Sequence, residues 1–399
     1  MTLRKQKVDG DRAKRLLCPI AVLLLGLSAP AAPAAPYRPT GDDVILERVP
    51  ARSDLERLAP LRAAVAQRPA DLSAALALSR GYIEIGRRTS DPRFIAYAQA
   101  ALAPWLARPS APEGALVLQA ITLQYLHRFD ESLTLLDRAL ALEPLDAQAW
   151  LTRAALLELH GNYSEARRAC ARLVRAADQL TALTCLSSVA SRNGELAASY
   201  LGLRSLASQA ARLPSELRVW MLSMLAEMAE RLGDDAAAEG ELQEALGVAR
   251  DDPYLKAMYA DLLLRLNRPH EVIALLAGSE AQDALLLRLA IAARRAGEPE
   301  AQRWAGLYAD RLRAAERARD FTHQREQAMY LLEVRDDPPA ALIAAASNWA
   351  LQREPSDLRV YAAAAQRVGS LADRQIIRNW LADTHYEDKT LTGLGTLVP

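Results

Sequence analysis

Five histidines and three cysteines are the residues of this 399-residue chain with the clearest potential for chemistry. No two histidines lie three or four positions apart, the spacing at which one helix could present two ligands to a metal ion. The sequence also has no C-x-x-C, H-E-x-x-H, G-x-S-x-G or glycine-rich phosphate loop. We therefore expect no catalytic residue, no metal site and no cofactor. The histidines are His127, His160, His270, His323 and His385, of which the first two fall at predicted turns.

Three pairs of acidic residues could in principle form a general acid and base. They are Asp234–Asp235, Asp251–Asp252 and Asp336–Asp337, and the last two precede Pro253 and Pro338. Aspartate is a preferred N-cap residue, and proline is favoured in the first turn of a helix. We expect these pairs to cap helices rather than to catalyse a reaction.

The N-terminus has the pattern of a secretory signal. A basic segment is followed by an apolar run from Leu16 to Ala29, which suits a signal peptide and is short for a membrane span. Small residues then offer cleavage sites ending at Ala31 or Ala34. We expect residues 1–35 to be removed and the mature protein to be periplasmic or secreted. The alternative is an uncleaved anchor in the inner membrane, facing the periplasm, and this segment is then the only membrane contact.

Composition favours an all-helical protein without a nucleic-acid partner. Alanine, leucine and arginine are abundant, aromatic residues make up 5% of the chain, and the formal net charge is zero. A basic excess that would favour nucleic acid is absent.

A repeated pattern organises most of the chain. Residues that tolerate positive φ recur between apolar-periodic segments, 30 to 39 positions apart from the second onward, which indicates stacked helical hairpins. These turn positions are Gly86, His127, Gly161, Gly194, Gly233, Asn267, Gly297, Asp336 and Gly369.

Two columns of small residues accompany the turns. Seven positions before each turn the residue is small except at Met329, which allows two helices to approach closely: Ser79, Ala120, Ala154, Ser187, Ala226, Ala260, Ala290 and Ala362. Five positions after the turn a second column is interrupted by Gln302 and Arg374: Ser132, Ala166, Ser199, Ala238, Val272 and Ala341.

This pattern resembles the tetratricopeptide repeat family, with its best matches at residues 113–146 and 147–180. The first carries Ala120, Phe129, Ala139 and Pro144, and the second Trp150, Gly161, Tyr163 and Ala166. Lys256 and Arg325 depart from it, because they occupy a normally bulky apolar position. The resemblance implies an all-α, right-handed α-solenoid of about eight or nine hairpins over residues 70–382. We expect an extended arm and a cap helix at 36–69, and a loose tail at 383–399.

Cys170 and Cys185 remain if Cys18 is removed with the signal. An even pair in an exported chain suggests a disulfide, and the helices that would carry these residues pack together in the family. The alternative is two buried thiols that act as small apolar residues.

By resemblance, the first helices of the hairpins line a concave groove that binds a protein or peptide segment. Trp220 and Tyr254 could be aromatic anchors, and Glu227, Glu230 and Asp261 would make the groove acidic and favour a basic segment. The alternatives are core packing for the aromatic residues and a solvated face for the acids. The full set of groove positions is Gln124, Leu151, Glu158, Trp220, Ser223, Glu227, Glu230, Tyr254, Asp261 and Arg294.

The sequence therefore favours a non-catalytic interaction scaffold of the bacterial cell envelope. The first alternative is a membrane-anchored accessory factor of envelope assembly or secretion. An enzyme with a site hidden in the C-terminal half and a self-associating structural protein are the other two.

Overall fold

The computed structural model describes residues 53–318 and 323–394, which are helical almost throughout. Helix α1 (Ser53–Gln67) precedes nine hairpins. These are α2 (Leu72–Thr89) and α3 (Arg93–Leu106), α4 (Glu113–Tyr125) and α5 (Phe129–Leu142), α6 (Ala147–Leu159) and α7 (Tyr163–Ala176), α8 (Gln179–Ser191) and α9 (Leu196–Ser205), α10 (Ser215–Arg231) and α11 (Asp235–Val248), α12 (Pro253–Arg265) and α13 (Pro269–Leu275), α14 (Asp283–Ala296) and α15 (Ala301–Ala318), α16 (Gln324–Glu333) and α17 (Pro338–Leu351), and α18 (Pro355–Val368) and α19 (Leu371–Thr384).

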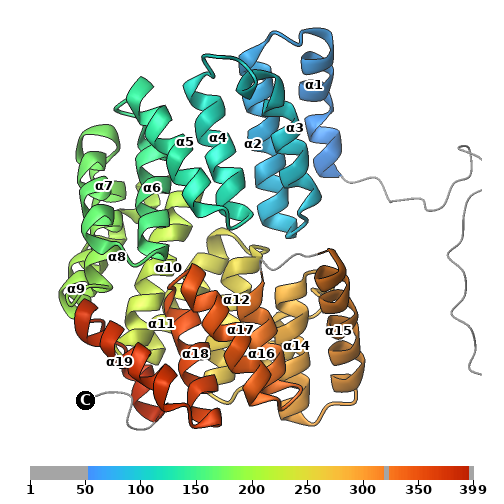
Figure 1. The fold of residues 1–399 in the computed structure, drawn as a ribbon, viewed down its shortest axis with the longest axis vertical. Coiled ribbons are helices and arrows are strands. Elements are labelled where there is room, and N and C mark those ends of the chain that lie inside the picture. Colours follow the sequence, from blue (N-terminus) through green and yellow to red (C-terminus); the bar gives the residue numbers. More distant parts are fainter. Residues whose placement is uncertain (1–52, 319–322, 395–399) are drawn as a thin grey trace, which may run out of the picture. The chain divides into compact units, whose positions relative to one another are not determined.

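Short 3₁₀ helices, η1 (Ala207–Arg212) and η2 (Lys389–Leu394), complete the described elements, which include no strand. Consecutive helices stack on one another (Figure 1), confirming the predicted all-α solenoid. The expected signal peptide and extended arm lie outside the described residues.

The turns between helices are where the sequence pattern placed them. All eight predicted positions from His127 to Gly369 have positive φ, for example 55° at His127 and 72° at Gly161. The prediction for Gly86 is wrong, because α2 continues to Thr89 and the positive φ of 53° falls on Ser90. Gly86 instead lies inside the helix, where an added Cβ would come within 3.2 Å of the Ile95 side chain.

The two columns of small residues meet inside the α4–α5 hairpin. Ala120 and Ser132, one from each column, are both fully buried, and the Ser132 hydroxyl donates to the Ala120 carbonyl at 2.7 Å. Such a bond requires the two backbones to be close, which larger side chains would prevent. Three alanines of the second column are at most 1% exposed: Ala166, Ala238 and Ala341.

Aspartates begin several of the helices. The carboxylates of Asp234, Asp252 and Asp337 each accept a hydrogen bond from a backbone N–H in the first turn of the following helix. Pro253 and Pro338 occupy the first helical position after the latter two. The prediction that the paired acids cap helices is confirmed, and the reason is that an N-cap carboxylate satisfies an otherwise unpaired N–H.

Contacts between distant hairpins close the array on itself (Figure 1). The loop between α17 and α18 meets the end of α6, where the Arg353 N–H donates to the Leu159 carbonyl at 2.8 Å. Nearer the N-terminus, the Gln282 side chain donates to the Arg88 carbonyl at 3.4 Å, and α2 also contacts α12. Later parts of the chain therefore contact the C-terminal ends of α6 and α2.

The segment after α19 differs from the predicted loose tail. Tyr386 is 7% exposed and Leu391 is 1% exposed, and both belong to the core formed by α16 to α19. Two apolar side chains in a short polar segment are enough to hold it against the helices. The described part of the C-terminal segment is therefore packed.

Candidate functional site

The predicted groove residues divide into a central group and outlying members. On α4 and α6, Gln124 and Leu151 are half-buried, whereas Glu158 is buried. Trp220 on α10 packs against two core clusters and is half-buried, which matches the core-packing alternative more closely than an exposed anchor. Ser223 is buried and donates to the Val219 carbonyl at 2.8 Å.

The central group surrounds a small cavity of about 70 Å³. This is room for a few water molecules and is far below the roughly 300–1,000 Å³ of small-molecule pockets. Tyr254 lines the cavity and is 49% exposed, so its ring is the accessible aromatic surface of the site. The ionisable side chains that line it are Glu227, Glu230, Tyr254, Asp261, Arg288, Arg325, Glu354 and Arg359.

The prediction of an acidic groove is wrong, because the carboxylates already have arginine partners. Glu227 lies 2.9 Å from the Arg192 guanidinium, with Arg231 on its other oxygen at 3.4 Å. Asp261 receives two hydrogen bonds from Arg288, at 2.8 and 2.6 Å.

Glu230 joins two parts of the chain that are far apart in sequence. Its two oxygens accept from Arg265 at 3.0 Å and from Arg359 of α18 at 2.6 Å. The inner surface is thus a network of neutralised ion pairs, and these pairs link the middle hairpins to the C-terminal one.

Arg325 is the centre of the C-terminal half of this network. Its guanidinium donates to Glu326, to Glu354 at 3.1 Å and to the Ser356 hydroxyl at 2.7 Å. Burial alone would raise the pKa of Glu326, but the adjacent Arg325 and Arg288 guanidinium groups outweigh it and hold this pKa at about 2. The carboxylate of Glu326 is therefore charged at every physiological pH.

Glu158 lies in a different environment although it belongs to the same inner face. Burial raises its pKa to about 7, opposed by Arg192 and by the hydrogen bond that Ser188 donates at 3.1 Å. Its Oε1 atom, the Arg192 Nε–H and the Tyr163 hydroxyl are buried without a hydrogen-bond partner. Burying these groups without partners carries a desolvation cost. With a pKa of about 7, the Glu158 carboxyl group changes its protonation near neutral pH.

Arg294 lies away from the cavity, at the C-terminal end of α14. It is exposed, and its guanidinium donates to the Val334 carbonyl. This bond ties α14 to the end of α16, as expected for an arginine that satisfies a free helix carbonyl.

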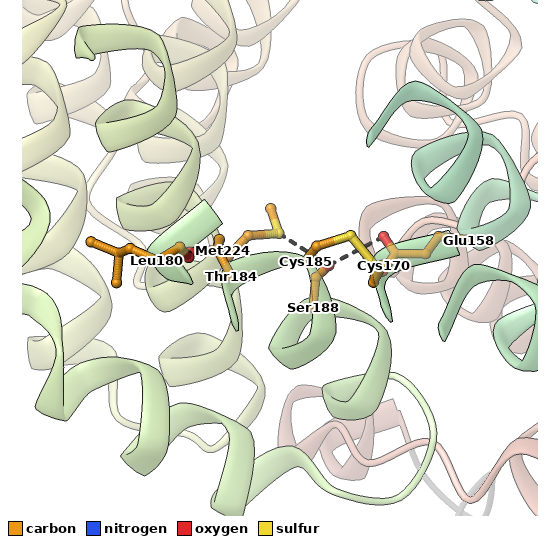
Figure 2. The surroundings of a disulfide bond; sticks show 7 residues. All are labelled: Glu158, Cys170, Leu180, Thr184, Cys185, Ser188 and Met224. Atoms are coloured by element: carbon orange, nitrogen blue, oxygen red, sulfur yellow. Dashed lines mark hydrogen bonds between the residues drawn. A yellow bond between two sulfur atoms is a disulfide. The ribbon is translucent and has the colours of Figure 1, made fainter. Parts of the chain in front are cut away.

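The structure has a disulfide between Cys170 of α7 and Cys185 of α8, with the Cα atoms 5.5 Å apart (Figure 2). Ser188, one turn along α8, contacts both Glu158 and the Met224 sulfur at 3.4 Å. The disulfide therefore lies next to the buried Glu158 and joins two hairpins of the array.

Several residues of the site were not found from the sequence. Arg288, Glu354 and Arg359 come from α14, the loop before α18 and α18 itself, and local pattern does not single them out. Arg325 did leave a signal, since it occupies a position that is normally bulky and apolar in the repeat. That departure marked the arginine around which the C-terminal part of the network forms.

Within 53–318 and 323–394, no group of three or more His, Cys, Asp or Glu side chains is arranged to hold a metal ion. No helix in the same ranges is both long and apolar enough to cross a membrane.

Comparison with known proteins supports the repeat class for part of the chain. Residues 117–180 match the tetratricopeptide repeat model, so this stretch consists of such repeats. No curated protein matches the chain.

Among solved structures, the chain is similar to a tetratricopeptide repeat protein from Parabacteroides merdae. The identity is 14%, the TM-score is 0.40, and the match covers 65% of this chain and 98% of the other. It is also similar to the APC/C hetero-tetramer Cut9–Hcn1, with 14% identity, a TM-score of 0.38, and coverage of 78% and 52%, respectively.

Proposed function

We propose that this protein is a non-catalytic interaction scaffold of the bacterial cell envelope, which binds a protein or peptide segment at the inner face of its solenoid. The tetratricopeptide match over residues 117–180 supports the class. The observation that carries the proposal is Tyr254, an aromatic residue that is 49% exposed beside a surface of paired charges. Exposed aromatic rings beside charged groups are typical anchors of protein interfaces.

Tyr254 is also the best residue for a test. Glu227→Lys would place a third positive charge beside Arg192 and Arg231, so a loss of binding there would report misfolding. Tyr254→Ala removes an accessible ring without breaking an ion pair. Tyr97→Ala is the matched control, because Tyr97 of α3 is also 49% exposed and does not line the cavity.

The experiment is affinity capture from envelope extracts with mature protein beginning at Pro36. We expect a partner that is retained by wild type and by Tyr97→Ala and is lost with Tyr254→Ala. A partner retained equally by all three proteins would contradict binding at this face. A defined oligomer without any partner would favour a self-associating structural role instead.

The proposed location is the periplasm or the cell exterior. A disulfide between Cys170 and Cys185 supports an oxidising compartment, since such bonds persist outside the reducing cytosol. N-terminal sequencing of the purified protein tests this location. A start between residues 32 and 36 agrees with an exported, cleaved chain. A start at Met1 or Thr2, with extraction that requires detergent, favours the membrane-anchored accessory factor.

A further inference from the structure

The segment that follows α19 lies in a site built by α8, α9, α10 and α18. His385 ends α19 with a φ of 54°, and the next three residues, Tyr386, Glu387 and Asp388, contact Arg231, the N-terminus of α9 and Arg359. The side chain of Asp388 is fully buried in its ion pair with Arg359, at 3.2 Å. The segment is thus bound through specific polar contacts in addition to its two buried apolar side chains.

Arg231 recognises both the aromatic ring and the backbone of this segment. Its guanidinium carbon lies 4.2 Å from the centre of the Tyr386 ring, and its Nε–H donates to the Glu387 carbonyl at 3.1 Å. Arg231 is itself fully buried and is held in place by Ser191 and Glu227. Ser191 and Glu227 do not belong to the segment, so they hold the Arg231 guanidinium in a fixed position from which it contacts the Tyr386 ring and the Glu387 carbonyl.

The N-terminus of α9 recognises the first acidic side chain. The Leu196 N–H, in the first turn of α9, donates to the Glu387 carboxylate at 3.2 Å. Glu195, at the N-cap position, makes no capping bond with its own side chain. Glu387 therefore supplies a helix cap from a distant part of the chain, and its negative charge is favourable at the positive end of the helix.

We propose that Arg231, Arg359 and the N-terminus of α9, here called the latch site, bind a peptide segment with an aromatic residue followed by two acidic residues. The chain's own Tyr386–Asp388 occupies the site in cis and competes with a partner segment of this chemistry. This inference rests on the proposed scaffold function and adds the kind of partner and its control. A tethered segment has an effective concentration on the order of millimolar, so it holds the site until a tighter or multivalent partner displaces it.

Release of the latch would also loosen the closed array. The segment bridges α18, through the bond from Arg359 to Asp388, and α10, through Arg231, so its loss removes one link between these helices although the direct Arg359–Glu230 pair remains. The inner face beside Tyr254 would then become more accessible. Occupancy of the latch site and access to the inner face are in this way coupled.

The test is binding of a dye-labelled peptide with the sequence of residues 384–394, followed by fluorescence anisotropy. The receptor is the mature chain from Pro36, either wild type or with Tyr386→Ala and Asp388→Asn together. We expect the double variant to bind the peptide about tenfold or more tightly than wild type, because its own segment no longer competes. Asp383→Asn is the matched receptor control, since Asp383 is an exposed carboxylate just before the segment. A peptide with alanine, glutamine and asparagine in place of its Tyr-Glu-Asp should not bind.

A folded double variant that binds the peptide no better than wild type would overturn the proposal. If the double variant loses its helical circular dichroism, the proposal is tested instead by hydrogen exchange of the wild-type protein with and without peptide. Saturating peptide should then raise exchange in residues 385–394, and unchanged exchange contradicts the latch. A wild-type dimer that dissociates in the double variant would place the segment in a second copy and overturn occupancy in cis.

These outcomes separate the latch from the scaffold function. Loss of a captured partner with Tyr254→Ala leaves the scaffold proposal intact even if the peptide does not bind. Peptide binding without any captured partner leaves the latch intact and removes support for the scaffold.

Discussion

The guanidinium of Arg353 donates a hydrogen bond to the carbonyl oxygen of His160 at 2.7 Å, across 193 positions of sequence. The backbone N–H of Arg353 donates to the preceding carbonyl, that of Leu159. Carbonyl groups at the end of a helix have no partner within it, and a cation is favourable there. The loop before α18 therefore caps the C-terminus of α6, which shows how the array closes.

Two glycine substitutions measure this contact. Gly161 and Gly297 have nearly the same positive φ, 72° and 74°. An alanine Cβ at Gly161 would lie 3.0 Å from the Arg353 guanidinium, whereas nothing lies within 4 Å at Gly297. We expect Gly297→Ala to cost about 1 kcal/mol, from backbone strain alone. Gly161→Ala should cost more and should increase hydrogen exchange at residues 352–354. Equal losses of unfolding free energy in urea would show that the α6–α18 contact contributes little.

The raised pKa of Glu158 predicts that the free energy of unfolding falls as the pH rises toward neutrality. Its pKa of about 7 in the folded protein exceeds the ordinary value of 4.5, so between these values the folded state holds a proton that the unfolded chain has released. The resulting loss of unfolding free energy, complete above pH 7, is at most about 3 kcal/mol, from roughly 1.4 kcal/mol per pKa unit.

Glu158→Gln should flatten this slope and make the protein more stable than wild type at pH 8. The exposed Glu84→Gln is the control and should leave the slope unchanged. Burial also raises the pKa of Asp357 to about 7, so part of the slope should persist in both variants. Chemical denaturation at pH 5, 6, 7 and 8 gives the slopes. Identical slopes for Glu158→Gln and wild type would be incompatible with a protonated Glu158.

Removal of the disulfide should lower stability by about 3 kcal/mol. The bond closes a loop with a sequence separation of 15 residues, and the chain-entropy model gives this magnitude for such a loop. Urea unfolding with and without reductant measures the difference. Cys170→Ser combined with Cys185→Ser should be insensitive to reductant. Two reactive thiols in the unreduced, unfolded protein would rule out the bond.

The ion pair between Arg288 and Asp261 should contribute far more than an exposed pair of similar geometry. Asp261→Asn removes the closer of the two carboxylates beside Arg288, whose side chain is only 2% exposed and which keeps Glu326 at 4.0 Å, so we expect a loss of about 2 kcal/mol. Asp283→Asn is the control. Asp283 pairs with Arg311 at 2.7 Å but is 57% exposed, and its loss should cost less than about 1 kcal/mol. Similar losses for both variants in urea unfolding would show that burial does not determine the cost.

The hairpins and their order follow from residue types and spacings along the chain. Turn residues such as Gly161 and Asp336, and buried small residues such as Ala120 and Ser132, act within a few positions or within one hairpin. The residue types therefore indicate which positions adopt positive φ and where two helices pack closely. The prediction of a turn at Gly86 was wrong because glycine also occurs at a buried position inside a helix, where residue type alone does not distinguish it from a turn.

The closure of the array and the chemistry of its inner face depend on contacts between hairpins that are distant in sequence. Curvature of a solenoid is the sum of small rotations between repeats, and no single residue type encodes that sum. Glu230 pairs with Arg359 of α18, Arg231 binds the C-terminal segment, and Glu227 pairs with Arg192 of the preceding hairpin, so the groove that the sequence suggested to be acidic is a neutralised network. The same closure brought Tyr386–Asp388 to the latch site, because contacts of that kind depend on three-dimensional proximity and leave no local pattern.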